Sequence, residues 1–210
     1  MPSPKVVHVV DDDEAVRDSA AILLDSAGYE VVTHESGVAF LEVLDQQEAG
    51  CVLLDIHMPG LTGLEVQREL KARKTPWPII VLTGQGDVQI AVQAMKDGAF
   101  EFLEKPYRND VLLGTLAEAF GMYEVSAQES ARAVEARALI AALAPRELQV
   151  MQGLLAGMAN KIIAYELDLS VRTVEIYRAN LMGKLKAKGL SNAIRIAIAA
   201  GLQPLEESAR

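Results

Sequence analysis

Five polar residues in the first half of the chain have the types and the placement that phosphoryl chemistry requires. Each stands at or shortly after the end of an apolar segment, and they are Asp11, Asp12, Asp55, Thr83 and Lys105. Carboxylate oxygens are ligands that Mg²⁺ accepts, and a carboxylate can also be the nucleophile that takes up a phosphoryl group. A lysine ammonium and a hydroxyl can hold the charged oxygens of that group. Together these residues predict phosphoryl transfer onto an aspartate.

Each of these residues also has an ordinary structural explanation when it is taken alone. The run Asp11–Asp13 is more often a helix-capping turn than a metal site, Thr83 is a common strand-end hydroxyl, and a lysine before Pro106 is usually only solvated. The coincidence favours function, because the acidic pair, the single acid, the hydroxyl and the lysine each follow a different apolar segment. Clustered carboxylates are also costly unless a cation binds them.

The elements that must position these residues are five strand–helix units. Apolar runs predict strands at Val6–Val10, Glu30–His34, Cys51–Leu54, Ile79–Leu82 and Phe100–Leu103. Amphipathic segments follow them, with capping residues at Asp13 and Ser36. This alternation predicts an α/β fold with a doubly wound, five-stranded parallel sheet of the flavodoxin-like kind, in which ligands lie beyond the carboxyl ends of the strands. The five polar residues would therefore meet in one crevice.

The remainder of the chain is expected to be all-α. Residues 125–143 contain no Gly or Pro and predict a helical linker, and residues 145–202 predict four helices that include a helix-turn-helix. We therefore expect an α/β domain over residues 1–121, a linker over 122–144 and a helix-turn-helix domain over 145–205.

Two serines are expected to start helices in this second part. Ser170 would cap a helix that runs to about Lys186. Ser191 would cap a last helix that stops at Gly201, since glycine is the usual residue after a helix end.

The charge of the chain is divided between its parts. The net charge is −9, yet residues 1–124 hold 9 basic and 21 acidic side chains, whereas residues 145–203 hold 8 basic and 4 acidic ones. An acidic domain repels phosphate unless a cation intervenes, while a basic domain attracts polyanions. The asymmetry therefore indicates two different tasks in one chain.

The surroundings of the protein can also be predicted. No segment is apolar over the roughly 18 to 20 residues that a membrane helix needs, and residues 1–5 lead into a strand rather than a signal peptide. The single cysteine, Cys51, fits a reducing compartment and is interpreted as a small buried hydrophobe. We therefore expect a cytoplasmic protein with no membrane partner.

The α/β part closely resembles the receiver domain of two-component response regulators over residues 5–120. The segments that carry the resemblance are Val9–Asp13, Leu54–Gly60, Leu82–Gly84 and Glu104–Pro106. It implies that a sensor histidine kinase phosphorylates Asp55. It also implies a Mg²⁺ cofactor, whose ligands would be Asp11, Asp12, Asp55 and the backbone carbonyl of His57.

The same resemblance implies a switch around the phosphoryl group. Lys105 would pair with the phosphoryl group, before a peptide bond to Pro106 that is typically cis. Thr83 would move toward the phosphate, and Phe102 would change rotamer behind it. Plain core packing is the alternative role for Phe102.

The helical part resembles the LuxR-type DNA-binding domain over about residues 144–202. The matching segments are Pro145–Glu147, Gly157–Ala164, Leu169–Glu175 and Lys184–Leu185. On composition alone, a small helical bundle with a solvated charged face would serve equally well. The resemblance implies a four-helix domain whose third helix, residues 171–186, enters the major groove of DNA.

The faces of that third helix indicate which residues contact DNA. Val174, Leu181 and Leu185 are expected on its buried face. Base edges are read by exposed side chains near the N-terminus of such a helix, so the candidate base readers are Glu175, Ile176 and Ala179. Candidates for phosphate contacts, which position the protein without specifying sequence, are Lys161, Arg172, Thr173, Tyr177, Arg178 and Lys184.

Both parts together resemble the FixJ group of response regulators, a likeness carried by residues 82–88, 94–99 and 173–180. It implies a transcription factor and not an enzyme, expected to be an activator, with promoter DNA and RNA polymerase as partners and a homodimer when phosphorylated. Two alternatives remain. A haloacid-dehalogenase-like phosphatase would use Asp11 and Asp13 but leaves Asp55 unexplained, and a regulator could bind DNA without any phosphorylation.

Overall fold

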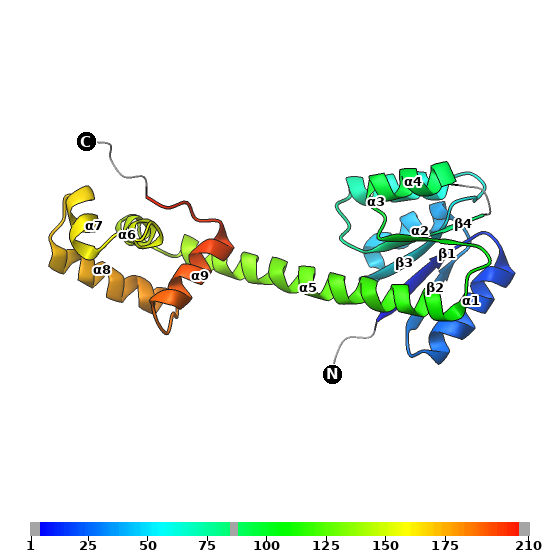
Figure 1. Cartoon of the computed structure of the whole chain (residues 1–210), viewed down its shortest axis with the longest axis horizontal. Coiled ribbons are helices and arrows are strands. Elements are labelled where there is room, and N and C mark those ends of the chain that lie inside the picture. Colours follow the sequence, from blue (N-terminus) through cyan, green and yellow to red (C-terminus); the bar gives the residue numbers. More distant parts are fainter. Residues whose placement is uncertain (1–4, 85–87, 206–210) are drawn as a thin grey trace. The chain divides into compact units, whose positions relative to one another are not determined.

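The apolar segments of the first 120 residues form one parallel sheet, as the sequence predicts (Figure 1). The structure is a computed structural model, and it describes residues 5–84 and 88–205. Its strands are β1 (Val6–Val10), β2 (Glu30–His34), β3 (Gly50–Asp55), β4 (Ile79–Thr83) and β5 (Glu101–Glu104). They pair in the order β2-β1-β3-β4-β5. All residues of β1, β3 and β4 are buried, which explains why these segments are mostly apolar rather than alternating.

The parallel register brings the ends of the central strands to the same edge of the sheet. Val10 of β1 pairs with Leu54 of β3, and Asp55 of β3 pairs with Leu82 of β4. The residues that end or follow these three strands are therefore neighbours, although they are far apart in the sequence.

Helices cover both faces of this sheet. They are α1 (Glu14–Ser26), α2 (Gly37–Val43), α3 (Gly63–Ala72), α4 (Val88–Asp97) and α5 (Asn109–Ala141), with a 3₁₀ turn, η1 (Leu44–Gln46), after α2. The predicted caps are confirmed, since Asp13 accepts from the backbone N–H of Ala15 at 2.9 Å and Ser36 accepts from that of Ala39 at 3.1 Å.

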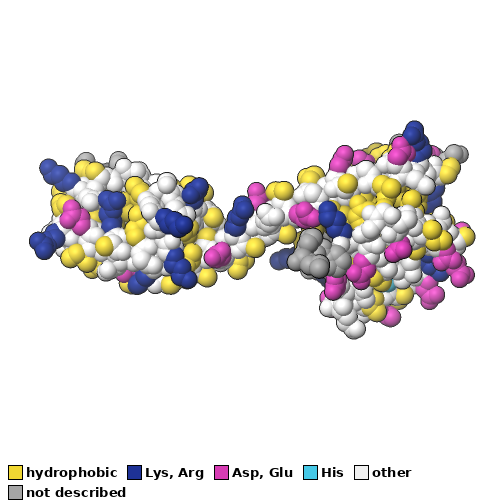
Figure 2. Space-filling model, turned by 90° about the horizontal axis from the view of Figure 1, so that it is seen from below, with side chains coloured by type: hydrophobic (Ala, Val, Ile, Leu, Met, Phe, Trp, Pro, Cys, Tyr) yellow, Lys and Arg dark blue, Asp and Glu magenta, His cyan; other side chains and the backbone are white. Residues whose placement is uncertain are grey.

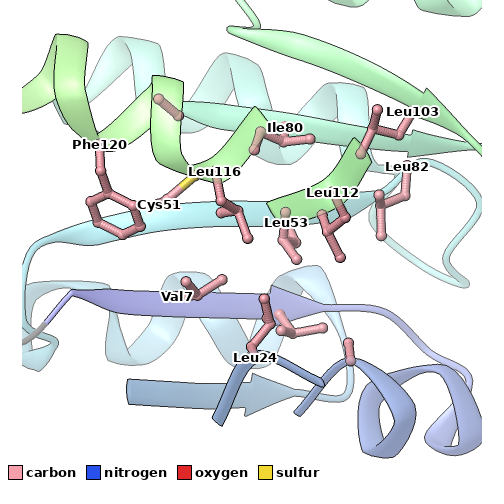
Figure 3. Close-up of a cluster of buried hydrophobic side chains, with 13 residues drawn as sticks. Val7, Leu24, Cys51, Leu53, Ile80, Leu82, Leu103, Leu112, Leu116 and Phe120 are labelled. Carbon is pink, nitrogen blue, oxygen red and sulfur yellow. The ribbon is translucent and has the colours of Figure 1, made fainter. Parts of the chain in front are cut away.

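These helices pack on the sheet through two hydrophobic clusters. In the first, Leu112 and Leu116 of α5 pack over Leu53 of β3, together with Leu24 of α1 (Figure 3). The second contains residues of the other three helices, such as Phe40, Val66 and Ala94, and sheet residues such as Leu54 and Val81. Since Leu53 and Leu54 point to opposite faces, the two clusters show that the sheet is doubly wound.

Cys51 belongs to the first cluster and is fully buried. Burial raises the pKa of its thiol to about 12, so the thiolate is not formed at neutral pH. Its interpretation as a small hydrophobe is confirmed.

Two histidines form a buried pair on the second-cluster side of the sheet. His8 is 0% exposed and His34 is 7% exposed, and Nδ1 of His8 lies 3.3 Å from Nε2 of His34. The other ring nitrogen of His8 lies 3.0 Å from the carbonyl oxygen of Glu48, and the His8 ring stacks on Trp77 with centroids 4.8 Å apart. Burial lowers the pKa of both imidazoles, that of His34 to about 4.

This pair predicts that the α/β part loses stability in mild acid. An imidazole whose folded pKa is depressed binds its proton only in the unfolded chain, so stability falls as pH drops from 6.5 to about 4 and then levels off. For His34 the loss is about 3 kcal/mol, from about 1.4 kcal/mol per pKa unit. Urea unfolding followed by the fluorescence of Trp77 should show this loss in the native chain and a smaller one in His34→Gln. Equal pH dependence in both proteins would contradict the assignment.

The helix predicted for the linker is present, because α5 continues without a break to Ala141. The chain divides into two compact units, an α/β unit (Met1–Val125) and a helical unit (Ser126–Arg210). The finer limits at residues 121, 144 and 205 stay predictions. No helix in the two described stretches has both the length and the apolar character that a membrane crossing demands.

Four helices follow α5 in the described part of the helical unit. They are α6 (Pro145–Leu155), α7 (Asn160–Glu166), α8 (Val171–Lys184) and α9 (Leu190–Ala200). Their core contains Met151, Ile163, Val174 and Leu181, and Leu143 from the end of the linker packs into it.

The two serine predictions have different outcomes. Ser170 caps α8, accepting from the backbone N–H of Thr173 at 3.0 Å. The cap at Ser191 is wrong, because α9 begins one residue earlier. The carbonyl of Gly189 accepts from the backbone N–H groups of Asn192 and Ala193, so Gly189 is the cap. Helix α8 also ends at Lys184 rather than Lys186, which has a left-handed φ of 52°.

Candidate functional site

A lysine joins the two aspartates at the carboxyl edge of the sheet. The ammonium of Lys105 donates to Oδ2 of Asp11 at 2.6 Å and to Oδ1 of Asp55 at 2.6 Å. The two carboxylates are almost completely buried, with 1% of Asp11 and 6% of Asp55 exposed. Residues after β1, at the end of β3 and after β5 therefore meet in one place, as the order of the strands requires.

The loop after β1 holds Asp11 in position. Its Oδ1 accepts from the backbone N–H of Asp13 at 3.0 Å, and its carbonyl oxygen accepts from the guanidinium of Arg17 at 2.9 Å. Asp13 itself is committed to the cap of α1. Neighbouring aspartates thus have different roles, because Asp13 caps α1 and Asp11 accepts from Lys105.

The pKa values of the site show how strongly its charges interact. Burial raises the pKa of Asp11, and hydrogen bonds from Lys105 and the Asp13 N–H offset this only in part. Burial would lower the pKa of Lys105, but hydrogen bonds to Asp11 and Asp55 outweigh it and raise that pKa. The lysine therefore stays charged at neutral pH, ready to pair with a phosphoryl oxygen.

The remaining predicted residues differ in their burial. Thr83 is buried at the end of β4, and its hydroxyl donates to the carbonyl of Gly84 at 3.4 Å. Asp12 and His57 are exposed. The peptide bond between Lys105 and Pro106 is cis. Residues 85–87, part of the FixJ-like segment, lie outside the described residues.

Phe102 is 41% exposed, so plain core packing is wrong for it. It lies on β5, an edge strand, and the buried residue there is its neighbour Leu103.

The donor atoms of this site suit Mg²⁺. The carboxylates of Asp11 and Asp55 face one compensating ammonium, and hard oxygen ligands of this kind match the ion. Within the described residues, no group of three or more His, Cys, Asp or Glu side chains could hold a metal by itself.

A cavity of about 520 Å³ opens beside the site. Lys105 lines it, together with Pro106 and Tyr107 after β5 and Ala15 and Val16 of α1. A partner that reaches Asp55 from this side would therefore meet an apolar surface next to the lysine.

Helix α8 has the predicted faces. Val174, Leu181 and Leu185 are buried, while Glu175, Ile176 and Ala179 are exposed. Arg172 is also exposed, one residue into the helix. Lys and Arg side chains gather on this unit and Asp and Glu side chains on the α/β unit, in the view of Figure 2.

Three of the predicted phosphate contacts have side-chain partners within the unit, and one of them is Thr173, whose hydroxyl lies 2.7 Å from that of Ser170. Lys184 donates to Oε2 of Glu147 at 2.6 Å, and Arg178 donates to the side-chain oxygen of Asn160. The sequence carries no signal for the pair of Lys184 and Glu147, whose members are 37 residues apart and lie on α8 and α6. Glu147 also accepts from the backbone N–H of Ala144. One carboxylate therefore caps the start of α6 and binds the end of α8.

Removing the cation of this pair should destabilise the helical unit. The hydrogen bond from Lys184 holds the pKa of Glu147 below its ordinary 4.5, so the pair contributes stability above that pH and loses it as pH falls through the lowered value. Lys184→Met should therefore melt earlier than the native chain at neutral pH, with the gap closing in acid. Circular dichroism melts measure this, and Lys161→Met, which removes an exposed lysine, is the control. A constant gap at all pH values would show that lost packing, not charge, is responsible.

Comparison with known proteins identifies the family. Residues 7–117 match the response regulator receiver domain, and residues 141–197 match bacterial regulatory proteins of the luxR family. The transcriptional regulatory protein FixJ of Bradyrhizobium diazoefficiens is 48% identical over 196 residues, which cover 93% of this chain and 96% of that protein. The chain belongs to the FixJ family of response regulators.

Solved structures of the FixJ family and of its relatives agree. The full-length FixJ from B. japonicum is 48% identical with a TM-score of 0.60, covering 94% of this chain and 97% of that one. The response regulator StyR is 37% identical with a TM-score of 0.82, covering 93% and 99%. As a FixJ-family protein, the chain is a transcription regulator with a receiver and a LuxR-type DNA-binding domain. The phosphatase alternative also loses its motif, since Asp13 is used as a helix cap.

Proposed function

We propose that phosphorylation of Asp55 by a sensor histidine kinase turns this regulator into a dimer that binds promoter DNA and activates transcription. The observation that carries the proposal is the hydrogen-bonded group of Asp11, Asp55 and Lys105, placed at the sheet edge of a chain that also carries a DNA-binding domain. Since its target is DNA, the protein would act in the cytoplasm.

The geometry supports the following course of the proposed transfer. Lys105 holds Oδ1 of Asp55, which leaves the second oxygen to attack the phosphorus of the phosphohistidine. The new P–O bond forms an acyl phosphate while the P–N bond breaks, and the released imidazole of the kinase takes up a proton. Lys105 then neutralises part of the charge on the transferred oxygens. Mg²⁺, held by Asp11, Asp12, Asp55 and the His57 carbonyl, would supply further neutralisation when bound.

The response would spread through Thr83 to the face formed by α4, β5 and α5. The exposed apolar side chains of these elements include Val92 and Met95 of α4, Phe102 of β5 and Val111 of α5. Covering them in a homodimer would bury apolar surface, and two DNA-binding domains would then reach two half-sites together. RNA polymerase is the further partner that an activator requires.

The test is to treat the native chain with acetyl phosphate and Mg²⁺. We expect the intact mass to rise by one phosphoryl group, the protein to dimerise, and its affinity for a target promoter to increase. DNA binding of equal strength without phosphorylation would instead favour the phosphorylation-independent regulator.

On the DNA side, the base-reading and phosphate-contacting residues should behave differently. Arg172→Ala is expected to weaken binding to all sequences alike and to reduce the slope of log affinity against log salt by about 1. Glu175→Ala should relax the preference at one base pair, at a cost of about 1–3 kcal/mol for the preferred base. Competition binding with a set of single-base-substituted duplexes at several salt concentrations measures both. Equal base selectivity in native and Glu175→Ala would remove Glu175 from the readout.

A further inference from the structure

A groove of about 510 Å³ lies within the helical unit, where the last part of α5 meets the residues just after α8 and one side of α9. It is separate from the exposed face of α8 that carries Glu175, Ile176 and Ala179, none of which lines it. It therefore lies between α5, whose last part is the linker, and the C-terminal end of α8.

The walls of the groove carry three cations without protein partners. They are Arg132 of α5, Lys186 just after α8 and Arg195 of α9. The side chain of none of them makes a hydrogen bond or ion pair with any other residue in the stretches that the structure describes. Glu135 is the one acidic residue of the lining, so the groove has a net positive charge. Lys105 and Lys184 differ, since both donate to buried carboxylates.

The floor of the groove is apolar. Ala136 and Leu185 are buried there, and Leu139 and Ile196 are half-buried. Concave apolar surface with a few converging polar groups is typical of sites for small molecules. Asn192 adds an amide, whose oxygen accepts from the backbone N–H of Lys188 and whose nitrogen can still donate to a ligand.

We propose that this groove binds a small organic anion with an apolar body, such as an aromatic or branched aliphatic carboxylate. The anionic head pairs with Arg132, Arg195 and Lys186, and the apolar body covers Leu139 and Ile196. A guanidinium binds a carboxylate in bidentate fashion, which favours the two arginines as the primary contacts. The DNA-binding unit then has a chemical input of its own, in addition to the phosphorylation of the receiver.

Two other occupants explain the groove less well. DNA phosphates need exposed cations but would leave the apolar floor uncovered. A second copy docked by the same face would bring the like charges of Arg132, Lys186 and Arg195 against one another. Of the three occupants, only the small anion both pairs with the cations of the walls and covers the apolar floor.

The test uses 8-anilinonaphthalene-1-sulfonate as the probe, an aromatic anion whose fluorescence rises in apolar sites. The full native chain is compared with Arg132→Ala and Arg195→Ala. The matched control is Arg137→Ala, which removes an exposed arginine of the same helix that does not line the groove. Circular dichroism verifies that all variants are folded. N-phenyl-1-naphthylamine, which lacks the sulfonate, tests whether the charge matters.

We expect each groove variant to bind the sulfonate about ten-fold more weakly than the native chain, the loss of one charge-assisted contact, with Arg137→Ala unchanged. The uncharged probe should bind native and variants alike. Equal sulfonate affinity in all proteins would overturn the proposal. So would variants that keep sulfonate binding but show a lower salt dependence of DNA binding, because the cations would then serve the DNA backbone.

Discussion

The variant Asp55→Asn is expected to take up no phosphoryl group and to bind promoter DNA equally with and without acetyl phosphate. An amide nitrogen is not a nucleophile, yet asparagine has the size of aspartate, and its oxygen can still accept from Lys105. The replacement therefore removes the chemistry with little change in packing. Intact mass spectrometry after incubation with acetyl phosphate and Mg²⁺ measures uptake, and a DNA titration of the same samples measures the response.

The matched control for this experiment is Asp18→Asn, which removes an exposed aspartate from α1. It should gain one phosphoryl group as the native chain does. A phosphoryl group found on Asp55→Asn would show that another carboxylate, such as that of Asp12, is an acceptor. A native chain that stays unmodified would show that the receiver is regulated by something other than phosphorylation.

The variant Lys105→Met should slow phosphoryl uptake by about 100-fold or more, the usual cost of removing a group that neutralises developing charge. It also leaves Asp11 and Asp55 buried without their cation. Because the lysine lowers the pKa of Asp11 against the effect of burial, that pKa rises further in the variant. The rate of uptake should therefore fall and its pH profile should move to higher pH.

Stopped reactions analysed by intact mass over a range of pH measure both effects. Lys96→Met, which removes an exposed lysine from α4, changes the net charge equally and should match the native chain. A normal rate with a shifted pH profile would mean that Lys105 only tunes the aspartates. A slow rate with an unshifted profile would mean that it acts on the phosphoryl group alone.

Much of the α/β unit could be predicted from the sequence, because its information is local. A strand buried on both faces must be apolar throughout, and a parallel sheet must place its ligands at the carboxyl ends. The proximity of Asp11, Asp55 and Lys105 could therefore be predicted from the sequence. The geometry added what order along the chain does not contain, namely that one ammonium is shared by two carboxylates.

The two ion or histidine pairs that the sequence does not predict arise from contacts between distant segments, whereas the two wrong predictions arise from the local backbone and from the place of a strand in the sheet. Nothing near Lys184 in the sequence indicates Glu147, and nothing near His8 indicates His34. Ser191 is a reasonable cap by residue type, but the backbone at Gly189 already starts the helix. Phe102 is apolar, and only the position of β5 at the sheet edge leaves it exposed.

The burial of Cys51 has a practical consequence for measuring the response. The chain contains one thiol, and it is both inaccessible and protonated at neutral pH. Any cysteine introduced at an exposed position would thus be the only site for a maleimide dye. Two such cysteines, one in each unit, would make a donor–acceptor pair whose energy transfer follows the distance between receiver and DNA-binding domain as Asp55 is phosphorylated. Such experiments usually require that native cysteines are first replaced, and this protein does not need that step.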